Sequence, residues 1–336
     1  MFIISNNAKS QDIHFTQFYH SELNLNGANT GLINGDFRVS AIYRTQWTGF
    51  TKGFNTFGVA VDGPLRFINV GTFNTINMGL NISNDRSGDA VLNTLRFELP
   101  IGFKYGVDKR GKHEIAISVT PAYFSRSINP NALKFPNQFN YNIQDFDPNF
   151  FSFQVFPSNR FSKFDIDAGM IYKGQLSEHF VYVLGGNIRH LIQPEENFLA
   201  KKSTLPMRMT GHAMFDFGLG RQNKLHIRPQ VLYMTQAAAV QMSPAVVLAY
   251  FMKNPKYQDD NTEIFLGGGY RLNDAYHFML GGTWKNVRLG MSYDYNVSEL
   301  QAVTNTFGAA EVSLTYIKKI PYPIPPKTIM PCIRFL

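Results

Sequence analysis

Between residues 276 and 295 the chain alternates between apolar and polar side chains, and this period of two limits the fold more than any other feature. Successive side chains of a β-strand point to opposite faces, so such a period is typical of a strand with one apolar face. The pattern therefore predicts a β-hairpin that turns at Lys285-Asn286. Its apolar positions are Tyr276, Phe278, Leu280, Gly282 and Trp284, then Val287, Leu289, Met291, Tyr293 and Tyr295.

Such a hairpin fits either a half-buried soluble sheet or a transmembrane β-barrel, and the placement of aromatic residues favours the barrel. Tyr276 and Trp284 lie on the apolar face near the two ends of the first strand. Their separation is roughly 26 Å at about 3.3 Å per residue, or about 20 Å along the membrane normal after a tilt of about 40°. The rings would then lie at the two borders of the hydrocarbon layer. We expect arginine to disrupt folding at lipid-facing Leu280 and to be tolerated at lumen-facing Gly281.

The composition fits a barrel and gives no sign of a membrane-spanning helix. Of 336 residues, 44% are hydrophobic, 14% aromatic and 17% charged. The longest apolar run, residues 245–252, is far shorter than the roughly 18 residues that a spanning helix needs. A closed barrel satisfies every backbone polar group in lipid without helices.

Alternating runs recur through most of the chain, with no helical stretch between them. Early runs are residues 37–43, 76–82, 95–105 and 115–123, and later ones start near Phe164, Phe180, Met207, Leu225 and Pro244. We count about fourteen strands, an even number as in single-chain bacterial barrels. The sequence therefore predicts an all-β fold, a transmembrane antiparallel β-barrel over residues 36–317.

Residues 11–35 precede this pattern and are rich in Asn, Gly, Ser and Thr without a sustained period. A barrel of about fourteen strands is too wide for its wall side chains to fill. We therefore predict that this segment is a plug that bonds to lumen residues such as Arg38, Arg44 and Asp294. A docking arm in the periplasm is the alternative.

The two ends of the chain have other signatures. Residues 1–10 resemble the remnant of a secretory signal peptide, with apolar Phe2-Ile3-Ile4 and small residues around Lys9, although an irregular N-terminus is the alternative. Residues 318–336 predict an extended, Pro-rich periplasmic tail, either a spacer or a docking peptide. The single cysteine is either a free thiol or an intermolecular partner. The docking candidates are Pro321, Pro323, Pro325 and Cys332.

The net charge of +8 does not indicate nucleic-acid binding, because Lys and Arg occur singly or in pairs rather than as a patch. Arginines instead fall at polar-facing strand positions, which favours a hydrated interior with fixed charge. These positions are Arg38, Arg96, Arg189, Arg208, Arg228 and Arg288.

Motifs for catalysis, cofactors or metals are absent from the sequence. The eight histidines lack metal-ligand spacing, and one cysteine cannot form a thiolate cluster. Asp165 and Asp167 are alternate residues of one strand, which fits a lumen surface better than a tuned acid–base pair. We predict no enzyme activity, no cofactor and no metal, with a barrel hydrolase as the less favoured alternative.

The connections between strands predict an orientation. Residues 124–161, 192–205 and 297–308 form long connections at one end, whereas the connections at the other end, such as residues 106–112 and 285–286, are mostly shorter. In outer-membrane barrels the long loops are extracellular and the short turns periplasmic. We therefore expect both termini in the periplasm of a Gram-negative cell.

Four stretches resemble the PorP/SprF family of outer-membrane proteins of the type IX secretion system. Residues 11–19 resemble its start Q-D-P-x-F-S-Q-[FY], residues 43–47 its Y-R-x-Q-W, residues 270–275 its Y-R-x-x-D-A and residues 291–296 its G-Y-S-Y-D-Y. Order and spacing both hold. The matching residues are Gln11, Asp12, Phe15, Gln17, Tyr43, Arg44, Gln46, Trp47, Tyr270, Arg271, Asp274, Tyr293 and Asp294.

Two further stretches depart from the family patterns. Residues 26–31 lack the Pro of N-P-A-x-x-G, and residues 308–314 lack the His of G-x-H-E-[IV]-S-L. The resemblance implies a non-enzymatic component of protein export, which contacts outer-membrane lipids and the lipoprotein and partner subunits of a periplasmic ring. Its cargo would be secreted adhesins or proteins with a C-terminal signal, and adhesin delivery would serve gliding motility in some bacteria.

Two other function classes stay open. A channel for small hydrophobic molecules, similar to long-chain fatty-acid transporters, would share the strand number and the plug and would hold an apolar pocket in its lumen. A passive porin would have an open polar bore.

Overall fold

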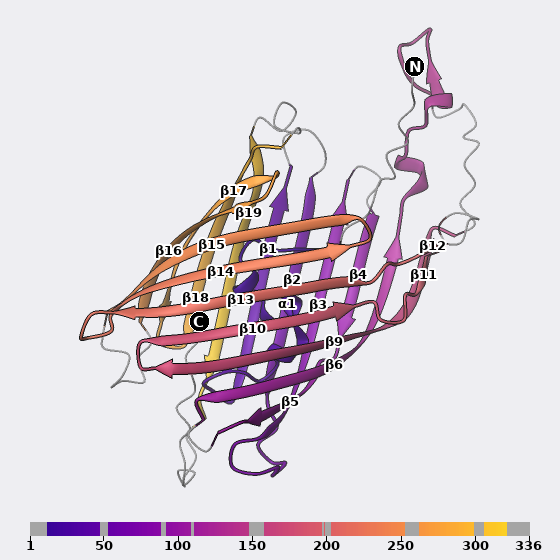
Figure 1. Ribbon diagram of the computed structural model, residues 1–336. Coiled ribbons are helices and arrows are strands. Elements are labelled where there is room, and N and C mark those ends of the chain that lie inside the picture. The colour runs from indigo at the N-terminus through magenta and orange to yellow at the C-terminus, as the bar shows by residue number, and fades with distance from the viewer. Residues whose placement is uncertain are drawn as a thin grey trace.

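The period-two runs form antiparallel strands that close on themselves (Figure 1). The computed structural model describes residues 12–47, 53–88, 92–108, 111–147, 158–196, 198, 203–252, 262–298 and 306–320. Residues 1–10, Gln11 and the tail with Pro321, Pro323, Pro325 and Cys332 lie outside the described residues, so the predictions for them stay predictions.

The barrel wall consists of long strands in chain order. They are β1 (Phe37–Gln46), β2 (Phe54–Pro64), β3 (Thr75–Ser87), β4 (Leu92–Glu98), β5 (Ile101–Gly106), β6 (His113–Ser127), β9 (Arg160–Ser177), β10 (Phe180–Arg189), β13 (Arg208–Leu219), β14 (Leu225–Gln236), β15 (Ala239–Phe251), β16 (Glu263–Arg271), β17 (Ala275–Trp284), β18 (Val287–Asn296) and β19 (Phe307–Lys318).

These strands form a 15-stranded sheet in which β4 and β5 lie end to end between β3 and β6, so the closed barrel has 14 strand positions. Pairing of β1 with β19 closes the sheet, from Phe37 opposite Lys318 to Gln46 opposite Ala309. The break between β4 and β5 falls at Pro100, which has no N–H to donate to a ladder. The predicted all-β closed barrel is confirmed.

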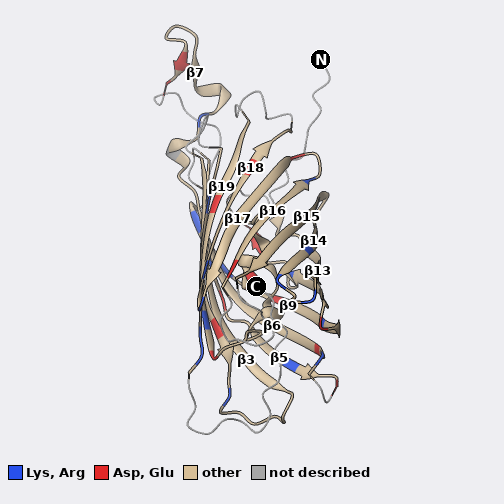
Figure 2. Cartoon of the chain, turned by 90° about the vertical axis from the view of Figure 1, so that its left-hand side faces the viewer, with Lys and Arg blue, Asp and Glu red and all other residues tan. Residues whose placement is uncertain are grey.

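The two faces of the wall are those that the alternation predicts. On the hairpin β17–β18, Leu280 is 56% and Trp284 72% exposed on the outside, whereas Asp294 is 1% exposed on the inside. Charged residues occupy few strand positions, as the mostly tan strands of Figure 2 show. None of the described helices is long and apolar enough to cross a membrane.

The lumen differs from the hydrated interior that the arginine pattern suggested. All of the polar-facing arginines named above point inward as predicted, but each is buried. Arg228, for example, lies 3.0 Å from Asp216 and 3.1 Å from Glu263. The arginines are buried because carboxylates and the N-terminal segment cover them.

The N-terminal segment lies inside the barrel and forms the predicted plug. It contains three short helical turns, η1 (Phe18–His20), α1 (Glu22–Leu25) and η2 (Gly27–Asn29), and α1 is seen within the barrel in Figure 1. Asn26 and Thr30 are fully buried. We use "plug" below for residues 12–35.

The plug runs the length of the barrel. We call the end with the start of β1 and the end of β19 the terminal rim, and the opposite end the loop rim. At the terminal rim, Asp36 N donates to Lys318 O at 2.8 Å, whereas at the loop rim Asp12 N donates to Oε1 of Gln236 at 3.0 Å. The first and last described residues therefore lie at opposite rims. The prediction that both ends of the chain are periplasmic concerns residues outside the described ranges and stays a prediction.

An arm extends from the loop rim between β6 and β9. It contains η3 (Pro130–Ala132), η4 (Pro136–Gln138), β7 (Phe139–Asn140) and β8 (Asp145–Phe146). Figure 2 shows β7 beyond the ends of the other strands. The small strands β11 (Glu195–Glu196) and β12 (Ser203–Thr204) pair at the same rim.

Candidate functional site

Asp294 and Glu311 are the carboxylates of a buried ionic cluster with Arg44 and Arg271, which we call the seam cluster. Nη2 of Arg44 lies 3.2 Å and Nη2 of Arg271 2.5 Å from Oδ2 of Asp294. Arg44 also pairs with Glu311. Each of these four residues is less than 5% exposed. Because a buried charge is costly unless it is paired, the cluster depends on all of its members.

Strand register brings the members of the seam cluster together. Arg44 of β1 stands directly opposite Glu311 of β19 at the closure of the barrel. Arg271 ends β16, where its Nε lies 2.5 Å from Oδ2 of Asp274 across a tight turn. The stretch Y-R-x-x-D-A is thus a turn that holds Arg271 in position for Asp294.

The plug uses the remaining bonding capacity of the two carboxylates. Thr16 N donates to Oε1 of Glu311 at 2.7 Å, and Gln17 N donates to Oε2 of the same side chain at 2.9 Å. Oγ1 of Thr16 donates to Oδ1 of Asp294 at 2.8 Å and accepts from Nη1 of Arg44 at 3.0 Å. The seam cluster therefore joins the closure of the barrel to the plug.

Sequence reasoning found some of these residues and missed others. Arg44, Arg271 and Asp294 meet in the seam cluster. Beside it, Asp274 pairs with Arg271, and Oε1 of Gln46 accepts from Nη2 of Arg44 at 3.3 Å. Glu311 was not singled out, although it stands at the Glu position of the family-like last strand.

Other candidates lie away from the cluster. Tyr43 is 46% and Tyr293 38% exposed on the outer face. The rings of Tyr270 and Tyr276 are tilted relative to each other, with their centroids 4.8 Å apart. Trp47 follows β1 and packs edge-on against Phe54, with the ring centroids 4.9 Å apart. Their period-two positions place these tyrosines on the lipid side.

The plug residues among the candidates are spread along the lumen. Phe15 and Gln17 are buried, at 5% and 3% exposure. Asp12 lies instead at the loop rim, where its Oδ2 is 2.6 Å from Nε2 of His190.

A second ionic group holds the plug near the terminal rim. Arg38 of β1 lies 2.9 Å from Glu22 of the plug and 2.9 Å from Asp62 of β2. Oδ2 of Asp62 also accepts from the backbone N of Gly31 at 2.7 Å. The predicted contact of the plug with Arg38 is therefore present.

A third group surrounds Asp12 and contains the one set of described residues with metal-ligand spacing, Asp165, Asp167 and His190. Arg96 already bonds both carboxylates, with Nη1 2.8 Å from Asp165 and Nη2 2.7 Å from Asp167. Nδ1 of His190 lies 2.6 Å from Oδ2 of Asp165. The guanidinium supplies the positive charge that a cation would bring, so the donor set does not favour a metal.

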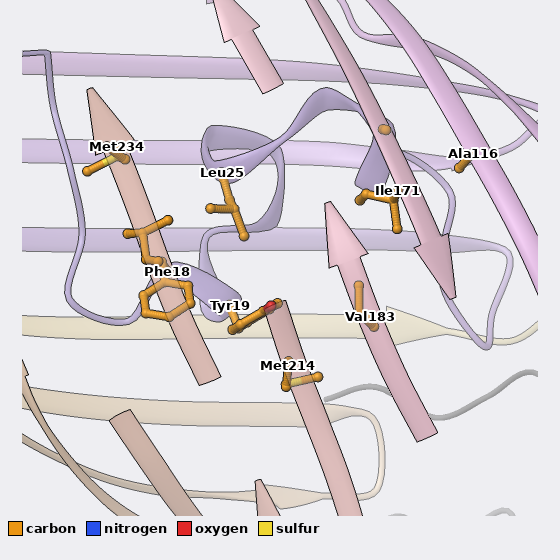
Figure 3. Close-up of a cluster of buried hydrophobic side chains, with 10 residues drawn as sticks. Phe18, Tyr19, Leu25, Ala116, Ile171, Val183, Met214 and Met234 are labelled. Atoms are coloured by element: carbon orange, nitrogen blue, oxygen red, sulfur yellow. The ribbon is translucent and has the colours of Figure 1, made fainter. Parts of the chain in front are cut away.

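Apolar contacts seat the middle of the plug. Phe18, Tyr19 and Leu25 point towards the inner wall, as Figure 3 shows. Their neighbours are Ala116, Ile171, Val183, Met214, Leu232 and Met234. The phenol of Tyr19 also lies 3.2 Å from Nδ1 of His212. Burial of these side chains stabilises the plug by roughly 1.5–3 kcal/mol each.

Together these contacts hold the plug at both rims and at mid-lumen. The carboxylates of the three groups are bonded to Arg, His or backbone N–H, and several of these bonds join the plug to the wall of the barrel.

Comparison with known proteins agrees with this architecture. The family described as "Type IX secretion system membrane protein PorP/SprF" matches residues 7–316. None of the curated proteins matches the chain. Among solved structures, the toluene transporter TbuX of Ralstonia pickettii is 10% identical with a TM-score of 0.51, over 90% of this chain and 93% of that one. The toluene transporter TodX of P. putida is also 10% identical with a TM-score of 0.51, over 88% and 93%.

Proposed function

The chain belongs to the PorP/SprF family of type IX secretion system membrane proteins, and on this premise we propose that it is a non-enzymatic outer-membrane component linking the periplasmic ring to the export or surface display of secreted proteins. In gliding bacteria the displayed proteins would be adhesins. The observation that carries the proposal is the family match over residues 7–316, together with the meeting of four family-like stretches in or beside the seam cluster.

The plug supports a docking role over a conduit role. A secreted polypeptide could pass through the barrel only after the plug had left its contacts with Glu311, Asp62 and His190. These contacts are buried and largely charge-assisted, which makes them among the stronger hydrogen bonds in proteins. The protein would therefore act through surfaces at its two rims.

We assign the loop rim to the cell exterior and the terminal rim to the periplasm. The arm lies at the loop rim, and long loops of outer-membrane barrels are extracellular. Tyr141 and Ile143 of the arm are 85% and 59% exposed, so they present apolar surface to a secreted partner. The ring subunits would bind the terminal rim and the tail of residues 318–336.

The two alternative functions have unequal support. The fold likeness to toluene transporters favours a channel for small hydrophobic molecules, but the cavity beside the plug has a volume of only about 70 Å³ and is lined in part by Arg96, Arg126 and Arg189. A passive porin needs an open bore, which the plug opposes.

Affinity purification from solubilised outer membranes tests the proposal. We expect ring lipoproteins and secreted surface proteins to co-purify with the full chain. Deletion of residues 321–336 should remove the ring subunits and leave conductance in planar bilayers unchanged, whereas deletion of residues 12–30 should raise conductance and spare ring binding. Recovery of neither ring subunits nor secreted proteins would favour the small-molecule channel.

A further inference from the structure

The outer face of the barrel differs between its two sides at the loop rim. On β16–β19 the outward positions nearest this rim form an aromatic register row, Tyr270, Tyr276, Tyr295 and Phe307. Such a row is typical of the aromatic girdle at a membrane interface. On β2, β3, β4, β6 and β9 the outward positions nearest the same rim form a row that we call the polar row: Asn55, Arg86, Asn93, Ser127 and Arg160.

A second row of aromatic residues places the polar row relative to the membrane. Phe97, Tyr123 and Phe164 face outward in one register row, with exposures of 38%, 39% and 76%. On β4, Asn93 lies beyond Phe97 towards the loop rim by about 13 Å of strand at roughly 3.3 Å per residue, or about 10 Å along the membrane normal at a tilt of about 40°. Headgroups lie just outside the hydrocarbon layer that such aromatic rows border. The polar row is therefore at headgroup height.

The polar row carries positive charge without neighbouring carboxylates. Arg86 and Arg160 are both exposed. Among the described residues, Arg86 has no side-chain partner, and Arg160 donates only from Nε, to Oγ of Ser125 at 3.1 Å. The Asp and Glu residues of the described wall strands face the lumen instead. The two guanidinium groups are thus free to bind an anion, and phosphate matches their planar array of N–H donors.

Strand register fixes the spacing of these two arginines. Arg86 is opposite Asn93, Asn93 is opposite Ser127, and Ser127 is opposite Arg160. Three strand spacings of about 4.8 Å separate the arginines by roughly 14 Å. This gap suits two phosphates, one on each guanidinium, better than one phosphate shared by both.

An amide group lies between the two arginines. Oδ1 of Asn93 accepts from Nδ2 of Asn84 at 2.9 Å, which orients the side chain of Asn93 and leaves its own Nδ2 without a partner among the described residues. A side-chain amide nitrogen can donate two hydrogen bonds. A sugar hydroxyl between two phosphates would find a donor at this position.

We propose that the polar row binds a glycolipid of the outer leaflet whose disaccharide headgroup carries two phosphates, as in lipopolysaccharide. The phosphates accept from Arg86 and Arg160, and the acyl chains lie against the aromatic row below. The bound lipid holds the base of the arm, because β6 ends and β9 begins beside the polar row. The inference rests on the assignment of the loop rim to the cell exterior, but not on the role in export.

Native mass spectrometry of the full-length protein in detergent tests the site, with diphosphoryl lipid A as the probe and lipid A without phosphates as its uncharged match. We expect the probe to bind about tenfold more tightly than the match, since hydrogen bonds to charged groups are the stronger ones. Arg86→Gln and Arg160→Gln should each weaken binding of the probe, and the double variant should show no preference between the lipids. The control Lys285→Gln removes an exposed cation at the terminal rim and should leave the preference unchanged.

The comparison of the two lipids on the wild-type protein keeps the test valid if a variant does not fold. Equal affinity for the two lipids, or an unchanged preference in the double variant, would overturn the proposal. If the double variant keeps the lipid preference but no longer co-purifies with secreted protein, the polar row binds a protein instead. Ring subunits should co-purify with the double variant, so a failure of lipid binding is distinguishable from a failure of the function proposed above.

Discussion

Arg44 and Glu311 face each other across the pair of strands that closes the barrel, and Glu311 simultaneously accepts the backbone N–H groups of Thr16 and Gln17 in the plug. One carboxylate therefore serves both the closure of the wall and the retention of the plug. Both side chains are almost fully buried, so neither charge has water as a substitute partner.

Removal of the Glu311 charge should destabilise the barrel strongly. Glu311→Gln leaves Arg44 partly unpaired in the lumen, and loss of one partner of a buried pair costs about 3–5 kcal/mol. Urea unfolding of the protein refolded into lipid vesicles measures this cost. The double variant Arg44→Gln/Glu311→Gln should lose less than the sum of the two single variants; strictly additive losses would show that the pair is not coupled.

Gly169→Ala should loosen the plug. A Cβ at Gly169 would lie 2.0 Å from Oδ1 of Asn26, so the side chain of Asn26 must move. That side chain now donates from Nδ2 to the backbone O of Met170 and of Gly186, at 3.1 and 3.0 Å. Each lost hydrogen bond costs about 0.5–1.5 kcal/mol. We expect higher conductance in planar bilayers and faster proteolysis of the plug.

The matched control is Gly186→Ala on the outer face, where a Cβ would have its nearest neighbour at 3.9 Å. That variant should behave like the wild-type protein. If both variants conduct equally, the fit of Asn26 to β9 does not hold the plug.

Arginine at Leu280 should impair folding. Leu280 is 56% exposed on the lipid side, and arginine near mid-membrane costs about 2–4 kcal/mol. The control Leu280→Met should fold normally, as measured by the difference in gel mobility between heated and unheated protein. Thr94→Arg places the charge in the lumen opposite Asp85 and should cost less than Leu280→Arg; equal damage would mean that the assignment of faces is wrong.

The sequence suggested Gly281→Arg as that lumen control, and the structure rules it out. A Cβ at Gly281 would lie 2.3 Å from the backbone O of Leu289 and 2.4 Å from the Phe265 ring. The position faces inward as predicted, but close packing leaves no room for a side chain.

Loss of the apolar tip of the arm should weaken capture of secreted proteins. Tyr141→Ala/Ile143→Ala removes exposed side chains and leaves the ring contact of Phe139 with Phe146, at 5.3 Å, in place. We expect several-fold less secreted protein in affinity purifications, with normal recovery of ring subunits. The control Phe67→Ala removes an aromatic side chain that is 83% exposed at the terminal rim. If only that variant loses secreted protein, the terminal rim and not the loop rim binds the secreted partner.

Much of the barrel was predictable because its information is local. A period of two fixes which side chains of β17 and β18 face lipid and which face the lumen, and this holds for Leu280 and Asp294 alike. The plug was predictable in outline, since a wide bore needs an occupant and residues 11–35 lack the strand pattern. The family-like stretches identified Arg44, Arg271 and Asp294, but not their shared contact.

By itself the sequence determined the strands, their faces and the presence of a plug, because alternation and polarity act between neighbouring residues. The closed structure alone decided that Arg44 meets Glu311 and that Asp12 lies at the rim opposite Lys318. Those contacts join residues up to hundreds of positions apart, and their register depends on how all strands pair around the barrel. The burial of the lumen arginines has the same origin, since a charged side chain loses water only once the plug and the opposite wall have closed over it.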